Sequence, residues 1–442
     1  MLADLPNELL CGIADCLESE RDVNALARVD QKLFHLLDPY LYRRNGQQSG
    51  SSALRWAARH GRAGTARKAI RVGASVECRE PAQQHGGRKV HHSIEDCSPL
   101  FQAITRGHSE IVEILLEVPA LWMSITPTYE DGDSPLSYAA KVNGVVVVEA
   151  LLRLDKVDAD HKNSQGRTPL SLAAEAGNLD VTRLLLSSGR VEPDSVDRNR
   201  QTPFSWAALA GNAEMVKLIF EAGHGKVNPA SRDKHGRTPL FHATTMSLQD
   251  KTARVLQALF EIKGVDPDSP DNEEMTPLAH AARFDNAMAV QVLLDSGRVN
   301  PNGTYRGIGR TALHGAAEMN SEEVVRVLLD HDDVDPNIAD NDGHTPLTRA
   351  AIYDAEDIVR ILLQSSRVTD HDCKDVDGRT PLWWAARKDR LSTGEVLLSH
   401  GRVDIDCEDN EGVTPLMVAT NFGHTHFVKL MQQSTGKGML GS

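Results

Sequence analysis

Aromatic residues and cysteines are both scarce in this sequence. Phe, Trp and Tyr together make up 5% of the residues, so a buried core must consist mostly of Leu, Val and Ala. The six cysteines are scattered, without a CxxC pair or a dense framework. This usage argues against a small disulfide-stabilised secreted protein and predicts reduced thiols in the cytoplasm or the nucleus.

Long apolar runs and an excess of basic residues are missing too. The stretch 145–154, VVVVEALLRL, is interrupted by Glu149 and is shorter than the ~20 residues of a membrane span. The first residues include Asp4, Pro6 and Glu8, which do not suit a signal peptide. Lys and Arg number 48 against 62 Asp and Glu, for a net charge of −14. We therefore expect a cytoplasmic or nuclear protein that binds neither membranes nor nucleic acid directly.

Patterns typical of catalysis or cofactor binding are also weak. The segment GKGMLG at 436–441 fits G-x-G-x-x-G, but it follows an expected helix, whereas dinucleotide binding needs a strand before the glycines and a helix after them. His85, His91, His92 and Cys97 match no common zinc spacing. No nucleophile elbow or Ser, His and Asp set is evident. We expect no enzyme activity, no catalytic residues, no cofactor and no metal.

What the chain does contain is a repeat. It is marked by a serine or threonine before Pro-Leu, Pro-Phe or Ala-Leu, as in DVDGRTPLWWAAR at 375–387. The intervals between these residues are 34 to 38, and Ser52 marks a plausible additional first unit. The marker residues are Ser98, Ser134, Thr168, Thr202, Thr238, Thr276, Thr311, Thr345, Thr380 and Thr414.

Each unit predicts two helices and a turn-rich connector. Thr380 can cap a helix through its hydroxyl, and Pro381 suits the first helical position, where a missing N–H costs nothing. Small alanines follow on one face and would let a neighbouring helix approach closely. A second apolar-periodic segment such as 322–330 predicts the second helix. Connectors rich in Pro, Asn, Asp and Gly then favour tight turns.

This helix, turn, helix and hairpin loop, with T-P-L at the start, resembles the ankyrin repeat. The resemblance implies an all-α solenoid of about 10–11 repeats over residues 51–435, with an insertion at 79–96 and a flexible tail at 436–442. It also implies protein binding on a concave surface formed by the loops and the ends of the first helices.

Residues 1–48 do not fit the repeat and predict three short helices. They resemble an F-box, through L-P-x-E-[IL]-L-x-x-I and a later L-x-x-V, and the combination with ankyrin repeats resembles fungal proteins. The F-box resemblance implies docking to the adaptor subunit of a Skp-cullin-F-box ubiquitin ligase. The implied adaptor-binding residues are Leu5, Pro6, Glu8, Leu9, Leu10, Ile13 and Leu17. Alternatively, these helices only cover the exposed end of the solenoid.

Target recognition is expected on the seventh to tenth repeats, where apolar residues and arginines recur at positions that need not be buried. The expected target-binding residues are Phe284, Arg310, Met319, Ile352, Tyr353, Arg379 and Arg387. Aromatic and Arg residues contribute strongly to protein interfaces, and the arginines favour a partner with acids or phosphates. The leading hypothesis is a ligase substrate receptor that binds an unknown target. The alternative is an ankyrin scaffold or transcription coregulator without a ligase role.

Overall fold

The computed structural model describes residues 52–74, 76, 98–118, 131–245 and 249–438. These residues form 22 helices, and the β-pairing among them is an isolated bridge between Tyr305 and Arg310. The chain divides into two compact units, and each is described by itself. Unit 1 comprises Met1–Arg198 and Ala222–Lys226, and unit 2 comprises Asn199–Glu221 and Val227–Ser442.

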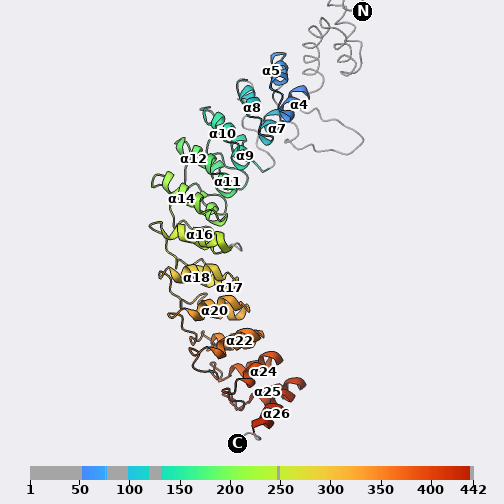
Figure 1. The fold of residues 1–442 in the computed structure, drawn as a ribbon, viewed down its shortest axis with the longest axis vertical. Coiled ribbons are helices and arrows are strands. Elements are labelled where there is room, and N and C mark those ends of the chain that lie inside the picture. Colours follow the sequence, from blue (N-terminus) through green and yellow to red (C-terminus); the bar gives the residue numbers. More distant parts are fainter. Residues whose placement is uncertain (1–51, 75, 77–97, 119–130, 246–248, 439–442) are drawn as a thin grey trace, which may run out of the picture. The chain divides into compact units, whose positions relative to one another are not determined.

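Unit 1 contains four described helix pairs, coloured blue to green in Figure 1. The bounds are α4 Ser52–His60 with α5 Ala63–Arg71, α7 Pro99–Thr105 with α8 Ser109–Leu116, α9 Pro135–Lys141 with α10 Val145–Leu152, and α11 Pro169–Ala176 with α12 Leu179–Ser187.

Unit 2 contains seven pairs, apart from the last residue of α14. They are α13 Pro203–Leu209 with α14 Ala213–Ala222, α15 Pro239–Ala243 with α16 Gln249–Phe260, α17 Pro277–Arg283 with α18 Ala287–Asp295, α19 Ala312–Glu318 with α20 Glu322–Asp330, α21 Pro346–Tyr353 with α22 Glu356–Gln364, α23 Pro381–Arg387 with α24 Leu391–Ser399, and α25 Pro415–Asn421 with α26 Thr425–Gly438. The all-α fold of repeated helix pairs is confirmed.

The first helices from α7 onwards begin as the Ser/Thr-Pro pattern predicts, whereas α4 begins at its marker residue Ser52. Thr380 has an extended backbone, and its hydroxyl accepts a hydrogen bond from the N–H of Trp383 at 3.2 Å, while Pro381 opens α23. In α19, Thr311 and His314 form a reciprocal capping box instead. These caps satisfy N–H groups that a helix leaves free at its start, and so define where each first helix begins.

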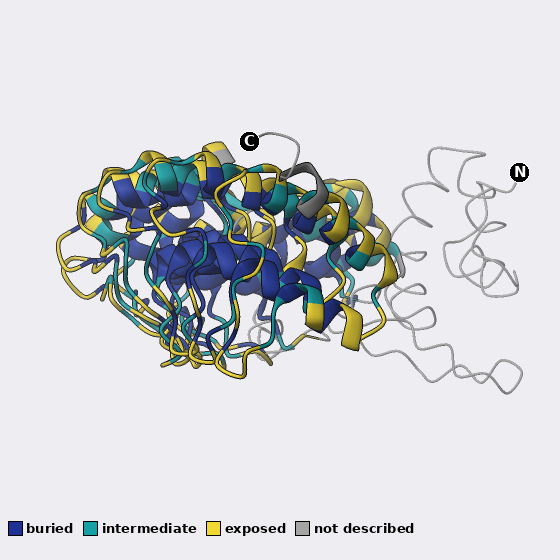
Figure 2. Cartoon of the chain, turned by 90° about the horizontal axis from the view of Figure 1, so that it is seen from below, coloured by how far each residue is buried: buried dark blue, intermediate teal, exposed yellow. Residues whose placement is uncertain are grey.

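Small buried alanines allow consecutive first helices to pack closely. In unit 2, α17 packs on α19, α19 on α21, α21 on α23 and α23 on α25. The alanine pairs at 281–282, 316–317, 350–351 and 385–386 are fully buried in this stack. Figure 2 shows the buried residues concentrated on helix faces inside the stack, with exposed residues on loops and helix ends. Each pair therefore depends on its neighbours for its core.

A tight loop precedes each first helix from α9 onwards, and we call it the pre-helix loop. In the loop at 375–379, the Asp375 carboxylate accepts the N–H groups of Asp377 and Arg379 at 2.9 and 2.8 Å. Successive loops are joined by backbone bonds, such as Asn410 N–H to Asp377 O at 3.0 Å. Gly378 has a φ of +78°, and a Cβ there would lie 2.8 Å from the Asn410 nitrogen, so a side chain does not fit.

Two segments predicted from the sequence lie outside the described residues: the F-box-like unit at 1–48 and the insertion at 79–96. At the other end of the repeats, α26 continues to Gly438, three residues past the boundary expected at 435. No helix of the described part is long and apolar enough to cross a bilayer.

Candidate functional site

Five side chains at the ends of consecutive first helices of unit 2 form what we call the exposed row. Its members are Phe284, Met319, Tyr353, Lys388 and Phe422, on α17, α19, α21, α23 and α25 or directly after them. The four large apolar members are exposed by 64% (Phe284), 43% (Met319), 46% (Tyr353) and 50% (Phe422). Large apolar side chains at the same place in consecutive repeats are a feature of an interaction surface rather than of a core.

The backbone explains why these side chains face solvent. Each member is followed by a residue with positive φ that ends the helical conformation, namely Asp285, Asn320, Asp354, Asp389 or Gly423. This left-handed residue reverses the chain towards the second helix. The side chain before it is therefore left at the end of the first helix.

Ring contacts position two of the apolar members. The Phe284 ring lies 4.5 Å from the ring of His280, which in turn lies 4.7 Å from Phe241. The Arg387 guanidinium lies 3.6 Å from the centroid of the Phe422 ring. These contacts limit the freedom of both rings before any partner binds, which lowers the entropy lost on binding.

Two of the arginines expected in the target site already have partners within the chain. Arg310 donates to Glu318 at 3.0 Å and lies 3.5 Å from the Asp340 carboxylate, and its side chain is 17% exposed. Arg379 pairs with Asp377 at 2.7 Å, with its guanidinium 4.7 Å from the Trp383 ring centroid. Both guanidinium groups are therefore engaged within the chain rather than free to bind a carboxylate or phosphate of a partner.

The other expected target residues lie on or beside the exposed row. Phe284, Met319 and Tyr353 belong to it, while Ile352 and Arg387 are half-buried next to it. Sequence reasoning did not select Lys388 or Phe422 as site residues. A signal for both was present, because each directly precedes a residue in the same repeat position as Asp285, Asn320 and Asp354.

A second recurring contact joins several first helices to their own pre-helix loops. The side chain nine residues after the loop aspartate contacts that carboxylate. The Trp384 indole donates to Asp375 at 2.8 Å, Arg349 Nε donates to Asp340 at 3.0 Å, and His242 lies 3.3 Å from Asp233. Burial alone would raise the pKa of Asp340, but its hydrogen bonds with Arg349 and the His344 N–H lower it. Asp340 is therefore a structural anion.

The Asp340 cluster also contains the described residues closest to a metal-ligand arrangement. One ligand atom each from Asp340, Asp342 and His344 lie within 4.8 Å of one another. However, Arg349 hydrogen-bonds to Asp340 and lies 3.5 Å from Asp342, and the other Asp340 oxygen accepts backbone N–H groups. Because a guanidinium already occupies these carboxylates, the cluster is an ion-pair network and not a cation site.

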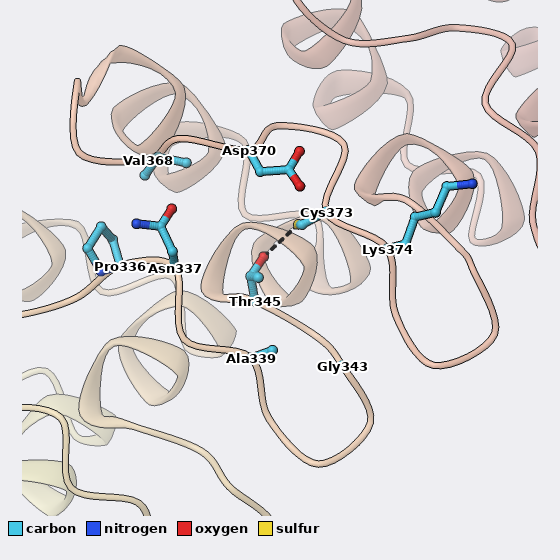
Figure 3. Close-up of a pocket in the computed structure, with 9 residues that line it drawn as sticks. All are labelled: Pro336, Asn337, Ala339, Gly343, Thr345, Val368, Asp370, Cys373 and Lys374. Carbon is cyan, nitrogen blue, oxygen red and sulfur yellow. Dashed lines mark hydrogen bonds between the residues drawn. The ribbon is translucent and has the colours of Figure 1, made fainter.

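A small hollow lies between the connectors of two repeats in unit 2 (Figure 3). It measures about 210 Å³ and is lined by residues from 336 to 374, including Thr345, Asp370 and Cys373. The Cys373 sulfur lies 2.9 Å from the Thr345 hydroxyl, and burial raises the pKa of the thiol. A protonated, buried thiol is a weak nucleophile, so this hollow lacks the chemistry of a covalent active site.

The described geometry thus presents a surface built from repeated helix ends, which is characteristic of proteins that bind other proteins. The chain belongs to the ankyrin-repeat family. A family model for ankyrin repeats (3 copies) matches residues 100–197, 189–259, 247–340, 300–375 and 365–438. As an ankyrin-repeat protein, it is a protein–protein interaction module.

Individual relatives match through limited stretches. The chain is 48% identical over 60 residues to a 26S proteasome non-ATPase regulatory subunit 10 of Dictyostelium discoideum, covering 14% of this chain and 26% of that protein. It is 45% identical over 56 residues to an ankyrin repeat domain-containing protein 29 of Danio rerio, covering 13% and 19%. It is 27% identical over 199 residues to a palmitoyltransferase of Lachancea kluyveri, covering 44% and 26%. The matches span about a quarter or less of each relative.

Proposed function

We propose that the protein is a substrate receptor of a Skp-cullin-F-box ubiquitin ligase, with residues 1–48 as the adaptor-binding unit and the repeats as the target-binding unit. The observation that carries target binding is the exposed row in unit 2, with four large apolar side chains exposed by 43% or more. The F-box-like pattern from Leu5 to Leu17 supports the ligase role, and it rests on sequence alone.

The similarity to named relatives adds little to this proposal. A proteasome regulatory subunit and a palmitoyltransferase share only stretches of up to 199 residues with the chain, and ankyrin repeats alone account for such matches. Ankyrin folds are reused for unrelated partners, so a relative's activity does not transfer through the repeats. We propose a non-catalytic binding protein, with a scaffold or transcription coregulator as the alternative.

The adaptor test uses the full chain with Leu9→Asp and Leu10→Asp. Each leucine would contribute ~1.5 to 3 kcal/mol if buried in the adaptor interface. We therefore expect the double variant to lose capture of a purified adaptor subunit, measured by pulldown and calorimetry. Its helical circular dichroism should stay that of the wild type, because the buried core described for the repeats begins at Leu54.

The same experiment separates the two candidate functions. If the wild-type chain does not bind the adaptor at micromolar concentrations, the ligase role fails and the scaffold role replaces it. In either case, affinity capture followed by mass spectrometry would identify the target.

A further inference from the structure

The first-helix ends of unit 1 carry exposed basic side chains. Arg59 lies in the last turn of α4, Arg106 directly after α7, and Lys141 at the end of α9, and all three are exposed. We call these three residues the basic edge. The residues with positive φ that follow them are Gly61, Gly107 and Asn143. In unit 2, three of the five residues in the same position are aspartates, so the basic edge lacks the acids that accompany the exposed row.

The cations of the basic edge are not neutralised within the described part of the chain. Arg59, Arg106 and Lys141 form no ion pair there, whereas Arg67 on α5 pairs with Glu110 at 3.3 Å. Residues 52–74 contain five arginines and one lysine but no Asp or Glu, in a chain with a net charge of −14. This local excess of positive charge runs against the charge of the whole protein.

Two of these cations lie at helix ends that touch. The first helices pack consecutively, α4 on α7 and α7 on α9. The Nε2 of His108 lies 3.3 Å from the carbonyl oxygen of Arg59, within hydrogen-bonding distance. A Cβ on Gly61 would lie 2.9 Å from the His108 ring. One short segment of a partner can therefore reach both Arg59 and Arg106.

Exposed apolar side chains lie on the same helices. Trp56 is 50% exposed, and its ring stacks on that of His60 with a centroid distance of 4.7 Å and an interplanar angle of 24°. Val142, next to Lys141, is 42% exposed. Trp and Arg are the residue types most enriched where protein interfaces gain their binding energy. The partner that fits this surface combines carboxylates with an apolar side chain.

Acids on neighbouring elements limit the length of that partner. Glu175 is exposed near the end of α11 and pairs with Arg167, and Glu110 and Glu113 are exposed on α8. A long polyanion such as nucleic acid would extend beyond the basic edge and meet these carboxylates. A short acidic segment of a protein can stay within the basic edge, where the charges of the two surfaces are complementary.

We propose that the basic edge of unit 1 binds a short acidic segment of a partner protein, with carboxylates on Arg59 and Arg106 and an apolar side chain against Trp56. A guanidinium can bind a carboxylate through two parallel N–H···O bonds, which gives direction as well as affinity. The inference goes beyond the proposed function, because it requires neither the adaptor nor the exposed row. It also moves the acidic partner, which the sequence suggested for Arg310 and Arg379, to unit 1.

The test measures fluorescence anisotropy of a labelled 12-residue peptide of Glu and Leu with the full-length protein. We expect binding that weakens as salt is added, because the contacts are exposed ion pairs. Arg59→Glu with Arg106→Glu should weaken binding at least 10-fold, and Trp56→Ser should weaken it as well. The matched control is Arg183→Glu with Arg198→Glu, which makes the same charge change at exposed positions of unit 1 outside the first-helix ends. It should change the affinity by less than twofold.

Three outcomes would overturn the proposal. The first is that wild type does not bind the peptide, and the second is that both double variants weaken binding equally, which would reduce the effect to net charge. The third is tighter binding of a single-stranded oligonucleotide or of phosphatidylserine vesicles than of the peptide. The variant Leu9→Asp with Leu10→Asp should bind the peptide as wild type does, so a failure here is distinguishable from failure of the ligase role.

Discussion

At the scale of single residues, the same connector position is Asn in one repeat and Asp in the next. Asn337 accepts the Thr369 N–H at 3.0 Å and donates to the Arg367 carbonyl at 2.8 Å. Asp372, one repeat later, accepts the Asp404 N–H at 2.9 Å, but its other carboxylate oxygen is buried without a hydrogen-bond partner. Burial, with Asp404 and Asp370 nearby, raises the pKa of Asp372.

Asp372→Asn should therefore stabilise the protein. The amide supplies a donor where the carboxylate has none, and we expect the free energy of unfolding at pH 7 to rise by about 1 kcal/mol in urea titrations. Because a raised carboxyl pKa makes the fold more stable as the pH falls, this contribution to the pH dependence should disappear in the variant. The reverse change, Asn337→Asp, should destabilise by a similar amount; a loss of stability in Asp372→Asn would contradict the interpretation.

The sequence predicted the helix caps well, but it did not predict the ion-pair partners of the arginines. The Thr-Pro helix starts were predictable, because a cap involves residues only three positions apart. The partners of Arg310 and Arg379 were not, although Asp377 and Glu318 are close in sequence. Whether such side chains pair or face solvent depends on how the pre-helix loop is oriented against the helix, and composition does not determine that orientation.

At the scale of elements, an arginine at the start of some connectors joins consecutive repeats. The Arg367 guanidinium donates to the carbonyls of Leu329 and Asp332 at 2.7 and 2.8 Å, and also to those of His331 and Val334. Arg190 in unit 1 makes the same four-carbonyl contact with residues 152–157. These carbonyls end the preceding second helix and its turn, where helices leave acceptors free.

Arg367→Met should lower the free energy of unfolding by about 2–3 kcal/mol, since it leaves several carbonyls without their charged donor. Arg402 occupies the corresponding position one repeat later and is exposed, so Arg402→Met is a matched control expected to change stability by less than about 0.5 kcal/mol. Equal effects of the two substitutions in urea unfolding would show that the contact is not stabilising. This difference between Arg367 and Arg402 could not be predicted from the sequence, because the carbonyls that Arg367 binds lie 33 to 38 residues away.

At the scale of the whole molecule, neutral buried histidines make unit 2 sensitive to acid. His314 accepts the Thr311 N–H at Nδ1 and donates from Nε2 to the His344 carbonyl at 3.0 Å. Burial lowers the pKa of His314 to about 4, and burial together with Arg237 and His242 lowers the pKa of His280 to about 4. A histidine with a lowered pKa stabilises the fold above its ordinary pKa of about 6.5, and this contribution is lost as the pH falls towards 4.

We therefore expect the stability of the protein to fall between about pH 6.5 and pH 4, by up to about 3 kcal/mol for each of these histidines. Urea unfolding followed by tryptophan fluorescence at several pH values would measure it. The double variant His280→Asn with His314→Asn should be less stable at pH 7 but show a shallower pH dependence. An unchanged slope would mean that other groups govern acid unfolding.

The residues with left-handed backbone that follow the members of the exposed row affect how the binding specificity of the protein can evolve. They define where each of these first helices ends, while the preceding side chain stays exposed. Substitutions at Phe284, Met319, Tyr353, Lys388 and Phe422 should thus alter recognition with little effect on folding. Selection can act on these five positions almost independently of one another, so related chains with the same repeats can acquire different partners through a few substitutions.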